Sequence, residues 1–304
     1  MLNYAYSNHK GVFMLRKNKA RKRKDYLVIL PLILIIIAVL GFHSFNNRPI
    51  AETSAARKSV VQEEAVKQEK VTTETVNLSD IVDTKNLQLV NSDYAFDSAE
   101  VGQSLASSSN GLLLRADVLS AVSGLLNDTR NTVGGELVLN SGYRSADEQS
   151  QLYLNTADKS YVQKPGHSEH ETALAADIAI QNVANVENSP QSKYLIENAW
   201  KYGFILRYPG DKTQVTGIAN EPWHFRYVGK IHAQYMSEHH LVLEEYINML
   251  KKSGGYNFNK DGQSYTVRYE IPTNNQLQLP HDEEYEISSD NTGGYVITSW
   301  KAME

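Results

Sequence analysis

Residues 26–42 form an uncharged run of mostly aliphatic residues, and this run constrains the chain more than any other feature. Its length reaches the lower limit for a helix that spans the hydrocarbon core of a bilayer. Eight basic residues and one acidic residue precede the run, and no A-x-A cleavage pattern follows it. A cleaved signal peptide is the alternative, but these flanks favour an uncleaved anchor. Because basic residues stay on the cytoplasmic side, we expect a single-pass protein of the cell membrane whose folded domain is extracellular.

The net charge of −5 conceals a contrast between the basic first 25 residues and an acidic remainder. An acidic body lacks the basic face that neutralises phosphates, so we expect no nucleic acid as a partner. The chain contains no cysteine, which excludes thiolate chemistry and disulfides. A domain of this kind must be held by an ordinary hydrophobic core, and any metal must be bound by histidine and carboxylate.

Composition divides the chain into five expected parts. Residues 46–80 are rich in Glu, Lys, Thr, Val and Ala and lack aromatic residues, which is typical of an extended stalk. The parts are a cytoplasmic basic segment (1–25), a transmembrane anchor (26–43), a stalk (44–83), a main domain (84–252) and a small β-rich C-terminal domain (253–304).

Strand-like and helix-like segments alternate in the main domain. The strands are expected near residues 87–90, 137–139, 174–180, 204–206 and 224–228, and the helices over 112–132, after Ser145, from Pro190 to Gly203, and over 229–252. Ser145 and Glu148 form a capping box that starts one of these helices. Three further strands are expected at 265–271, 285–287 and 295–300. The pattern predicts an α+β fold, a small antiparallel sheet with helices packed on it, followed by a β appendage.

Polar residues interrupt two of these strand-like segments. Asp177 lies inside the apolar run 174–180, where a buried carboxylate is costly unless it is paired or binds a metal. His170 precedes it by seven residues, and His224 opens another strand. Two imidazoles and one carboxylate make an open zinc site with a fourth position free for water. Glu221, three residues before His224, is then placed to act as a general base on that water.

Spacing alone leaves a structural role open for each of these residues. A lone histidine at a strand end is more often a hydrogen-bonded core residue than a ligand. His167 neighbours the others and is the one rival ligand, whereas His232, His239 and His240 are expected to pack or to face solvent.

Three motifs occur in order along the chain. They are Ser141-Gly-Tyr-Arg-Ser145 with Gln149, Ser168-x-His170-x-x-Ala173-x-Ala175-x-Asp177, and Glu221-Pro-Trp-His224. Together these motifs resemble the LAS family of peptidoglycan zinc peptidases, and within it the VanY-type D-alanyl-D-alanine carboxypeptidases. The resemblance covers residues 87–250 well and the remainder loosely.

The resemblance implies a metal and a base at the matching positions. His170, Asp177 and His224 would bind Zn²⁺, and Glu221 would act as base and proton shuttle. The implied domain 84–252 is a zinc peptidase. A D,D-carboxypeptidase of this kind removes the C-terminal D-Ala from peptidoglycan stems and thereby contributes to resistance to glycopeptides such as vancomycin.

The resemblance also implies residues that contact the substrate. Arg144 would stabilise the charge that develops on the scissile carbonyl oxygen, a task that suits the fixed donors of a guanidinium. Ser168 and Gln149 would hydrogen-bond the substrate. Trp223 is expected in the core rather than in a pocket wall.

Two alternative functions stay open. An L,D-carboxypeptidase acting on tetrapeptide stems would use the same ligands, and a non-catalytic peptidoglycan-binding protein would keep only the scaffold. Ala173 stands where the family has glycine. If the φ angle at this position is positive, we expect strain and a small displacement of His170 or Asp177.

Overall fold

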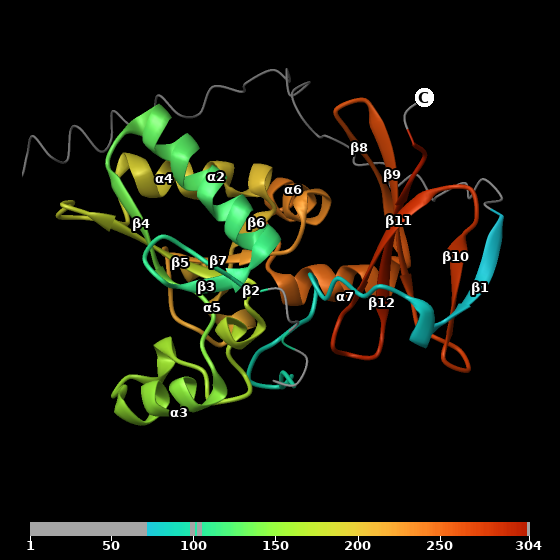
Figure 1. Cartoon of the computed structure of the whole chain (residues 1–304), viewed down its shortest axis with the longest axis horizontal. Helices are drawn as coiled ribbons and strands as arrows, with labels where there is room; N and C mark the ends of the chain where they lie inside the picture. Colours follow the sequence, from blue (N-terminus) through green and yellow to red (C-terminus); the bar gives the residue numbers. More distant parts are fainter. Residues whose placement is uncertain (1–71, 98–100, 102–104, 303–304) are drawn as a thin grey trace, which may run out of the picture. The chain divides into compact units, whose positions relative to one another are not determined.

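The computed structural model describes residues 72–97, 101 and 105–302 (Figure 1). The predicted basic segment and anchor, and the stalk as far as residue 71, lie outside the described residues. Among the helices that are described, none combines the length and apolar character needed to cross a membrane. On this finding the prediction of a single-pass membrane location with an extracellular domain is corrected.

A four-stranded antiparallel sheet forms the centre of the predicted main domain (Figure 1). In spatial order its strands are β4 (Glu136–Ser141), β5 (Ala175–Gln181), β7 (His224–Tyr227) and β6 (Phe204–Leu206). All four were predicted from short apolar runs, and each is confirmed to within a few residues. Asp177 of β5 pairs with Ser141 of β4 on one side and with His224 of β7 on the other.

Helices α2 (Ala116–Val133) and α4 (Pro190–Asn198) pack together against this sheet (Figure 1). Helix α2 presents Val118, Val122 and Leu125 to the core it shares with β4 and β5. These residues recur at the spacing of one helix face, which explains why an amphipathic helix forms here.

Helix α3 (Ala146–Asn155) begins at the predicted capping box. The Glu148 backbone N–H donates to Ser145 Oγ at 3.3 Å, and the Ser145 N–H donates to the Glu148 carboxylate at 2.8 Å. Because two otherwise unpaired N–H groups are satisfied in this way, the helix starts at a defined residue. The loop that carries Arg144 is therefore anchored at its end.

The expected long helix over residues 229–252 is in fact two helices, α6 (Lys230–Glu238) and α7 (Leu243–Ser253). Between them His240 adopts a φ of 53°, a left-handed conformation that interrupts a right-handed helix. The other short elements are β2 (Leu105–Ser107), β3 (Leu113–Arg115), α5 (Thr213–Thr216), and the 3-10 turns η1 (Leu78–Asp80), η3 (Lys159–Tyr161), η4 (Glu169–Thr172), η5 (Ala199–Tyr202) and η6 (Gly210–Lys212).

The C-terminal region contains more strands than the sequence predicts. Its four-stranded antiparallel sheet has the order β11-β12-β9-β8, with β8 at Gly255–Lys260, β9 at Gln263–Glu270, β11 at Glu284–Ser289 and β12 at Tyr295–Trp300. A separate pair joins β10 (Gln276–Pro280) to β1 (Thr73–Asn77). Strands β8 and β10 were not predicted, and β1 falls in residues assigned to the stalk.

One hydrophobic core joins the C-terminal sheet to helix α7 and to residues 86–91. Leu87 and Leu89, which were predicted to lie in a strand, are buried in irregular backbone instead. They share a core with Tyr246 of α7 and with Val267 and Val296 of the sheet. The C-terminal sheet and α7 therefore hold residues 86–91 in place.

Candidate metal centre and active site

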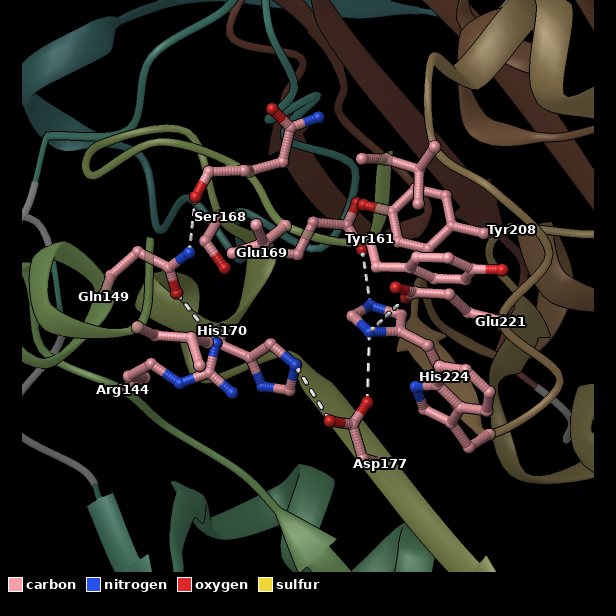
Figure 2. Close-up of a pocket in the computed structure, with 15 residues that line it drawn as sticks. Arg144, Gln149, Tyr161, Ser168, Glu169, His170, Asp177, Tyr208, Glu221 and His224 are labelled. Atoms are coloured by element: carbon pink, nitrogen blue, oxygen red, sulfur yellow. Dashed lines mark hydrogen bonds and ion pairs between the residues drawn. The ribbon is translucent and has the colours of Figure 1, made fainter. Parts of the chain in front are cut away.

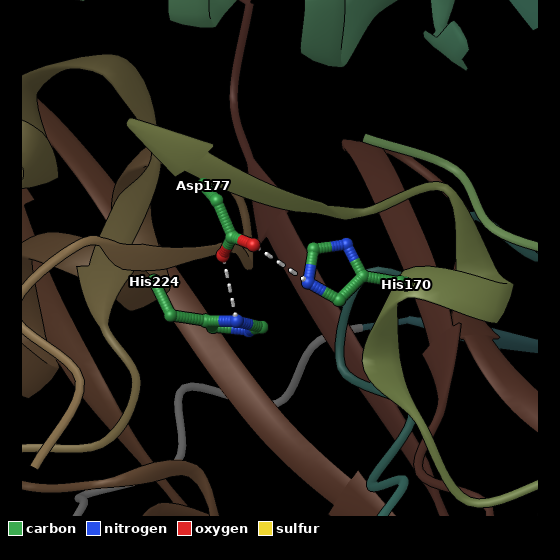
Figure 3. A group of neighbouring side chains, drawn as sticks. All are labelled: His170, Asp177 and His224. Atoms are coloured by element: carbon green, nitrogen blue, oxygen red, sulfur yellow. Dashed lines mark ion pairs between the residues drawn. The ribbon is translucent and has the colours of Figure 1, made fainter. Parts of the chain in front are cut away.

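The pairing of β5 with β7 brings two predicted ligands together (Figure 3). Asp177 Oδ1 lies 3.1 Å from His224 Nδ1. His170, in the turn η4 that precedes β5, places its Nε2 atom 3.3 Å from Asp177 Oδ2. One ligand atom from each of the three residues lies within 4.8 Å of the others. The chain thus gathers the predicted ligand set from two neighbouring strands and one turn.

The His170 ring is oriented by the backbone. Its Nδ1 atom lies 2.7 Å from the carbonyl oxygen of Gly142. A carbonyl oxygen only accepts, so Nδ1 carries the proton and donates, which leaves Nε2 as the nitrogen that would give its lone pair to a metal. A hydrogen bond of this kind selects the tautomer that a metal requires.

Ala173 adopts the left-handed conformation, with φ 60° and ψ 18°. Its N–H donates to the His170 carbonyl at 3.3 Å, which closes the turn η4 just before β5 begins. The φ at this position is therefore positive, which is the condition under which strain was expected, and a residue with a Cβ atom pays a penalty of about 1–2 kcal/mol for it. The gathered ligand atoms of His170 and Asp177 show that the turn is nevertheless formed.

The charge distribution at the three residues fits a divalent metal. Asp177 Oδ1 is buried, and no donor in the described part of the chain is oriented to hydrogen-bond with it. Burial alone would raise the pKa of Asp177, but His170 and His224 outweigh it and hold the pKa well below its usual range. Burial would likewise lower the pKa of His224, yet contacts with Asp177 and Glu169 raise that pKa to about 9. The site therefore stabilises positive charge, and its two imidazoles and carboxylate are donors that suit Zn²⁺.

Glu221 lies beside the ligand set. Its backbone N–H donates to the Tyr208 carbonyl at 2.9 Å, and its Oε2 atom lies 3.6 Å from His224 Nδ1. Burial raises the pKa of Glu221 to about 7, with added effects of the Asp177 and Glu169 charges and an opposing effect of His224. A carboxyl group that titrates near neutral pH is suited to accept a proton and return it.

The other predicted site residues line the same cavity of about 380 Å³ (Figure 2). They are Arg144, Gln149 and Ser168. Arg144 Nη1 donates to Gln149 Oε1 at 2.7 Å, and Nη2 donates to Ser141 Oγ at 3.0 Å. Gln149 in turn donates from Nε2 to the backbone carbonyl of Gln163 at 2.5 Å. These bonds hold the guanidinium in a fixed plane facing the cavity.

Trp223 also lines the cavity, so its expected place in the core is wrong. Its side chain is 38% exposed, and its ring stacks on Tyr161 with 6.4 Å between centroids. Leu152 and Ile218 line the cavity as well. Apolar side chains thus line the same cavity as the predicted ligands, the predicted base and the guanidinium.

His167, the rival ligand, does not join the group of three. Its Nδ1 atom lies 2.6 Å from the Asn91 carbonyl oxygen, to which it donates. His232 is buried, with Nδ1 2.6 Å from Tyr246 Oη and Nε2 3.2 Å from Thr298 Oγ1. Both histidines therefore have structural partners.

Two buried residues beside the ligands escaped the sequence analysis. Glu169 lies between the motif residues Ser168 and His170 and has Oε2 3.3 Å from His224 Nε2. Tyr208 packs against the His224 ring with 4.8 Å between centroids. The one feature of the sequence that could have indicated Glu169 was its position next to His170 in the second motif.

The sequence is similar to proteins of one enzyme family. The family model described as VanY, D-alanyl-D-alanine carboxypeptidase, matches residues 111–230. A D-alanyl-D-alanine carboxypeptidase of Enterococcus faecium is 37% identical over 234 residues, which cover 77% of this chain and 71% of that protein. The bifunctional D-Ala-D-Ala dipeptidase and D-Ala-D-Ala carboxypeptidase VanXYC of Enterococcus gallinarum is 36% identical over 132 residues, covering 39% of this chain and 70% of that protein.

Two solved structures share the fold. The D,D-dipeptidase VanXYg, in complex with a D-Ala-D-Ala phosphinate analog, matches with a TM-score of 0.67 and 30% identity, covering 76% of this chain and 99% of that chain. A variant of the D,D-pentapeptidase VanY from a VanB-type resistance cassette, in complex with Zn(II), matches with a TM-score of 0.50 and 32% identity. That match covers 54% of this chain and 99% of the other.

Proposed function

The chain belongs to the VanY family of D-alanyl-D-alanine carboxypeptidases, and from this membership we propose a zinc-dependent mechanism built on the residues of the cavity. The reaction hydrolyses the last peptide bond of a peptidoglycan stem that ends in D-Ala-D-Ala. It releases the C-terminal D-Ala and shortens the stem by one residue. Loss of this terminus removes the target of glycopeptide antibiotics, so the activity contributes to resistance.

His170, Asp177 and His224 would hold the zinc ion. The donors are His170 Nε2, an Asp177 carboxylate oxygen and His224 Nδ1, the three atoms that already face one another. A zinc ion in such a site supplies a Lewis acid that activates water and polarises a carbonyl group. The buried Asp177 Oδ1 without a hydrogen-bond donor supports this assignment.

Glu221 would move the proton. Its carboxylate takes a proton from the attacking water as the bond from water oxygen to the scissile carbonyl carbon forms. The carbon–nitrogen bond then breaks, and the same carboxyl group passes the proton to the leaving amino group of D-Ala. Burial raises the pKa of Glu221, which makes its carboxylate a stronger proton acceptor for the attacking water.

Arg144 would stabilise the negative charge that develops on the scissile carbonyl oxygen. Its guanidinium is held by Gln149 and Ser141, so the donors need no reorganisation during the reaction. Ser168 and Gln149 would orient the peptide through hydrogen bonds. The wall that includes Trp223 and Tyr161 would pack against the apolar parts of the stem.

One observation carries this proposal. A carboxyl group of near-neutral pKa and a fixed guanidinium share one cavity with a His-Asp-His group of metal-ligand geometry. A wall-binding protein has no use for a buried base and an oriented cation beside a metal site. Peptide hydrolysis uses all of them.

The test is product analysis on defined stems with the zinc-loaded full chain. We expect D-Ala release from the pentapeptide ending in D-Ala-D-Ala, with the tetrapeptide as the second product, and no release from the tetrapeptide itself. Release from the tetrapeptide alone would establish the L,D-carboxypeptidase alternative instead. Zinc binding without release from either stem would establish a non-catalytic binding protein. Free D-Ala-D-Ala is assayed in parallel, because the relative from Enterococcus gallinarum is bifunctional.

A further inference from the structure

A buried group of four charged residues lies behind the ligand His224. It consists of Glu169, Arg207, Arg226 and Glu244, whose exposed fractions range from 0% to 8%. The mechanism proposed above uses none of them. Burial of four charges is costly, so such a group is retained only where its contacts are well satisfied or serve the site.

Glu169 stands at the centre of this group, and its two oxygens have different partners. Oε1 accepts from Arg207 Nε and from Arg226 Nη1, both at 2.7 Å. Oε2 lies 3.3 Å from His224 Nε2 (Figure 2). The two guanidiniums thus fix the carboxylate while one oxygen remains to face the histidine.

The arginines are themselves anchored on other elements. Arg207 donates to both oxygens of Glu244 on α7, at 2.8 and 2.6 Å. Arg226 donates from Nη2 to the backbone carbonyls of Gln88 at 2.8 Å and Asn86 at 3.2 Å. Neither guanidinium can rotate freely, so the position of the Glu169 carboxylate is set by the fold.

This geometry determines which nitrogen of His224 carries the proton when a metal is bound. A carboxylate accepts hydrogen bonds, so Nε2 donates to Glu169 Oε2. The Nδ1 atom, 3.1 Å from Asp177 Oδ1, then keeps its lone pair toward the metal centre. Carboxylate partners of this kind orient a metal-bound histidine and increase its basicity.

We propose that Glu169 is a positioning residue for the metal centre, which holds His224 in the Nδ1-binding tautomer and orientation. The inference rests on the proposed zinc site and adds a residue that acts on the metal through His224. Because Glu169 also balances two buried arginines, its loss could weaken the fold as well as the metal site. A test must therefore separate these two effects.

The discriminating variant is Glu169→Gln, with Glu244→Gln as its matched control. In Glu169→Gln the single amide oxygen is drawn to the two arginines, which leaves the NH₂ group facing His224 Nε2. Two donors then face each other unless the histidine proton moves to Nδ1, where it blocks metal binding. Glu244→Gln removes the same charge from the same group without touching His224.

The experiment measures zinc affinity by competition with a chromophoric chelator, together with urea unfolding of the metal-free full chain. We expect Glu169→Gln to bind zinc about 10–100-fold more weakly than wild type. We expect Glu244→Gln to keep its zinc affinity within about threefold, even though its midpoint of unfolding falls. The visible spectrum of the cobalt-substituted protein should change in the first variant and stay unchanged in the second.

Four results overturn the inference. Wild-type zinc affinity in Glu169→Gln excludes a positioning role, and equal losses in both variants show a general effect of charge removal. A wild-type chain that binds no zinc removes the proposed function together with this inference. If Glu169→Gln does not fold, Glu169→Asp replaces it, because the shorter side chain keeps the charge for the arginines but withdraws from His224. A folded Glu169→Asp variant with unchanged zinc affinity would also contradict the inference.

Discussion

Asp177 and His224 are paired residues on adjacent antiparallel strands, with Asp177 Oδ1 3.1 Å from His224 Nδ1. Side chains of directly paired residues project from the same face of a sheet and lie close together. Two of the three proposed ligands therefore owe their separation to the strand register. Only His170 depends on a turn, and that turn is fixed by the αL conformation of Ala173.

Replacement of Glu221 by glutamine tests the assigned base. The amide cannot accept a proton from water, so we expect the turnover number to fall by about 10²–10⁴-fold. Zinc content should remain at one ion per chain, because Glu221 is not among the grouped ligands. The measurements are D-Ala release from the pentapeptide stem and metal analysis of the same sample. Activity that survives the substitution would refute the assignment of the base.

Replacement of Arg144 by lysine tests the proposed oxyanion partner. Lysine keeps the charge but loses the forked donors that bond Gln149 and Ser141. We expect the turnover number to fall by about 10²–10³-fold with a smaller change in KM. Arg130→Lys on α2 is the control, since Arg130 bonds Asn127 and the Leu137 carbonyl and does not line the cavity. Equal losses in both variants would argue against a role in the transition state.

Local patterns in the sequence predicted the parts of the fold that carry the site. The apolar runs of β5, β6 and β7 each predicted a strand, and polar residues inside or beside two of them made Asp177 and His224 candidates, whose role as ligands the family resemblance then implied. The capping box identified the start of α3. These features depend on residues a few positions apart, so a single sequence contains the information.

Features that depend on distant partners were missed. The Glu169 carboxylate contacts Arg207 and Arg226, which are 38 and 57 residues away along the chain, and no spacing rule links them. Trp223 was expected in the core rather than in a pocket wall. Its actual neighbour is Tyr161, on a turn more than sixty residues earlier. Strand β1 likewise forms because β10, some 200 residues later, offers a pairing edge.

Because His232 is buried and neutral, we expect the free energy of unfolding to fall as the pH is lowered. Burial lowers its pKa from 6.5 to about 4, so the folded chain keeps this ring neutral. Between pH 6.5 and 4 the unfolded state takes up a proton that the folded state does not, and stability falls as the pH falls. The full loss from this group is about 3 kcal/mol, since one pKa unit corresponds to about 1.4 kcal/mol. Above pH 6.5 the ring is neutral in both states, so it contributes no pH dependence to the free energy of unfolding.

The measurement is urea unfolding of the metal-free chain at pH 7, 5.5 and 4, compared with His232→Gln. Glutamine can hydrogen-bond Tyr246 and Thr298 but does not titrate. The stability advantage of wild type over the variant should shrink by about 3 kcal/mol from pH 7 to pH 4. If the free energies of unfolding of wild type and His232→Gln change with pH in parallel, His232 does not cause the loss of stability at low pH.

Ala173→Gly should stabilise the chain while leaving the site intact. Alanine at φ 60° carries a strain of about 1–2 kcal/mol, whereas glycine adopts this angle freely. Glycine also increases the entropy of the unfolded chain by roughly 0.5–1 kcal/mol, so we expect a net gain of about 0.5–1 kcal/mol. Ala179→Gly, in the middle of β5, has no such strain to relieve and should be destabilising by about 0.5–1 kcal/mol.

Measurement of zinc affinity in the same pair of variants distinguishes backbone strain at position 173 from displacement of the metal ligands. The ligand atoms already lie within 4.8 Å of one another with alanine in place. Relief of the strain should therefore leave zinc affinity and turnover within about twofold of wild type. A large increase in zinc affinity in Ala173→Gly would show instead that alanine displaces His170 or Asp177 from the metal-binding geometry. In that case the residue at position 173 tunes the metal centre as well as the stability of the turn.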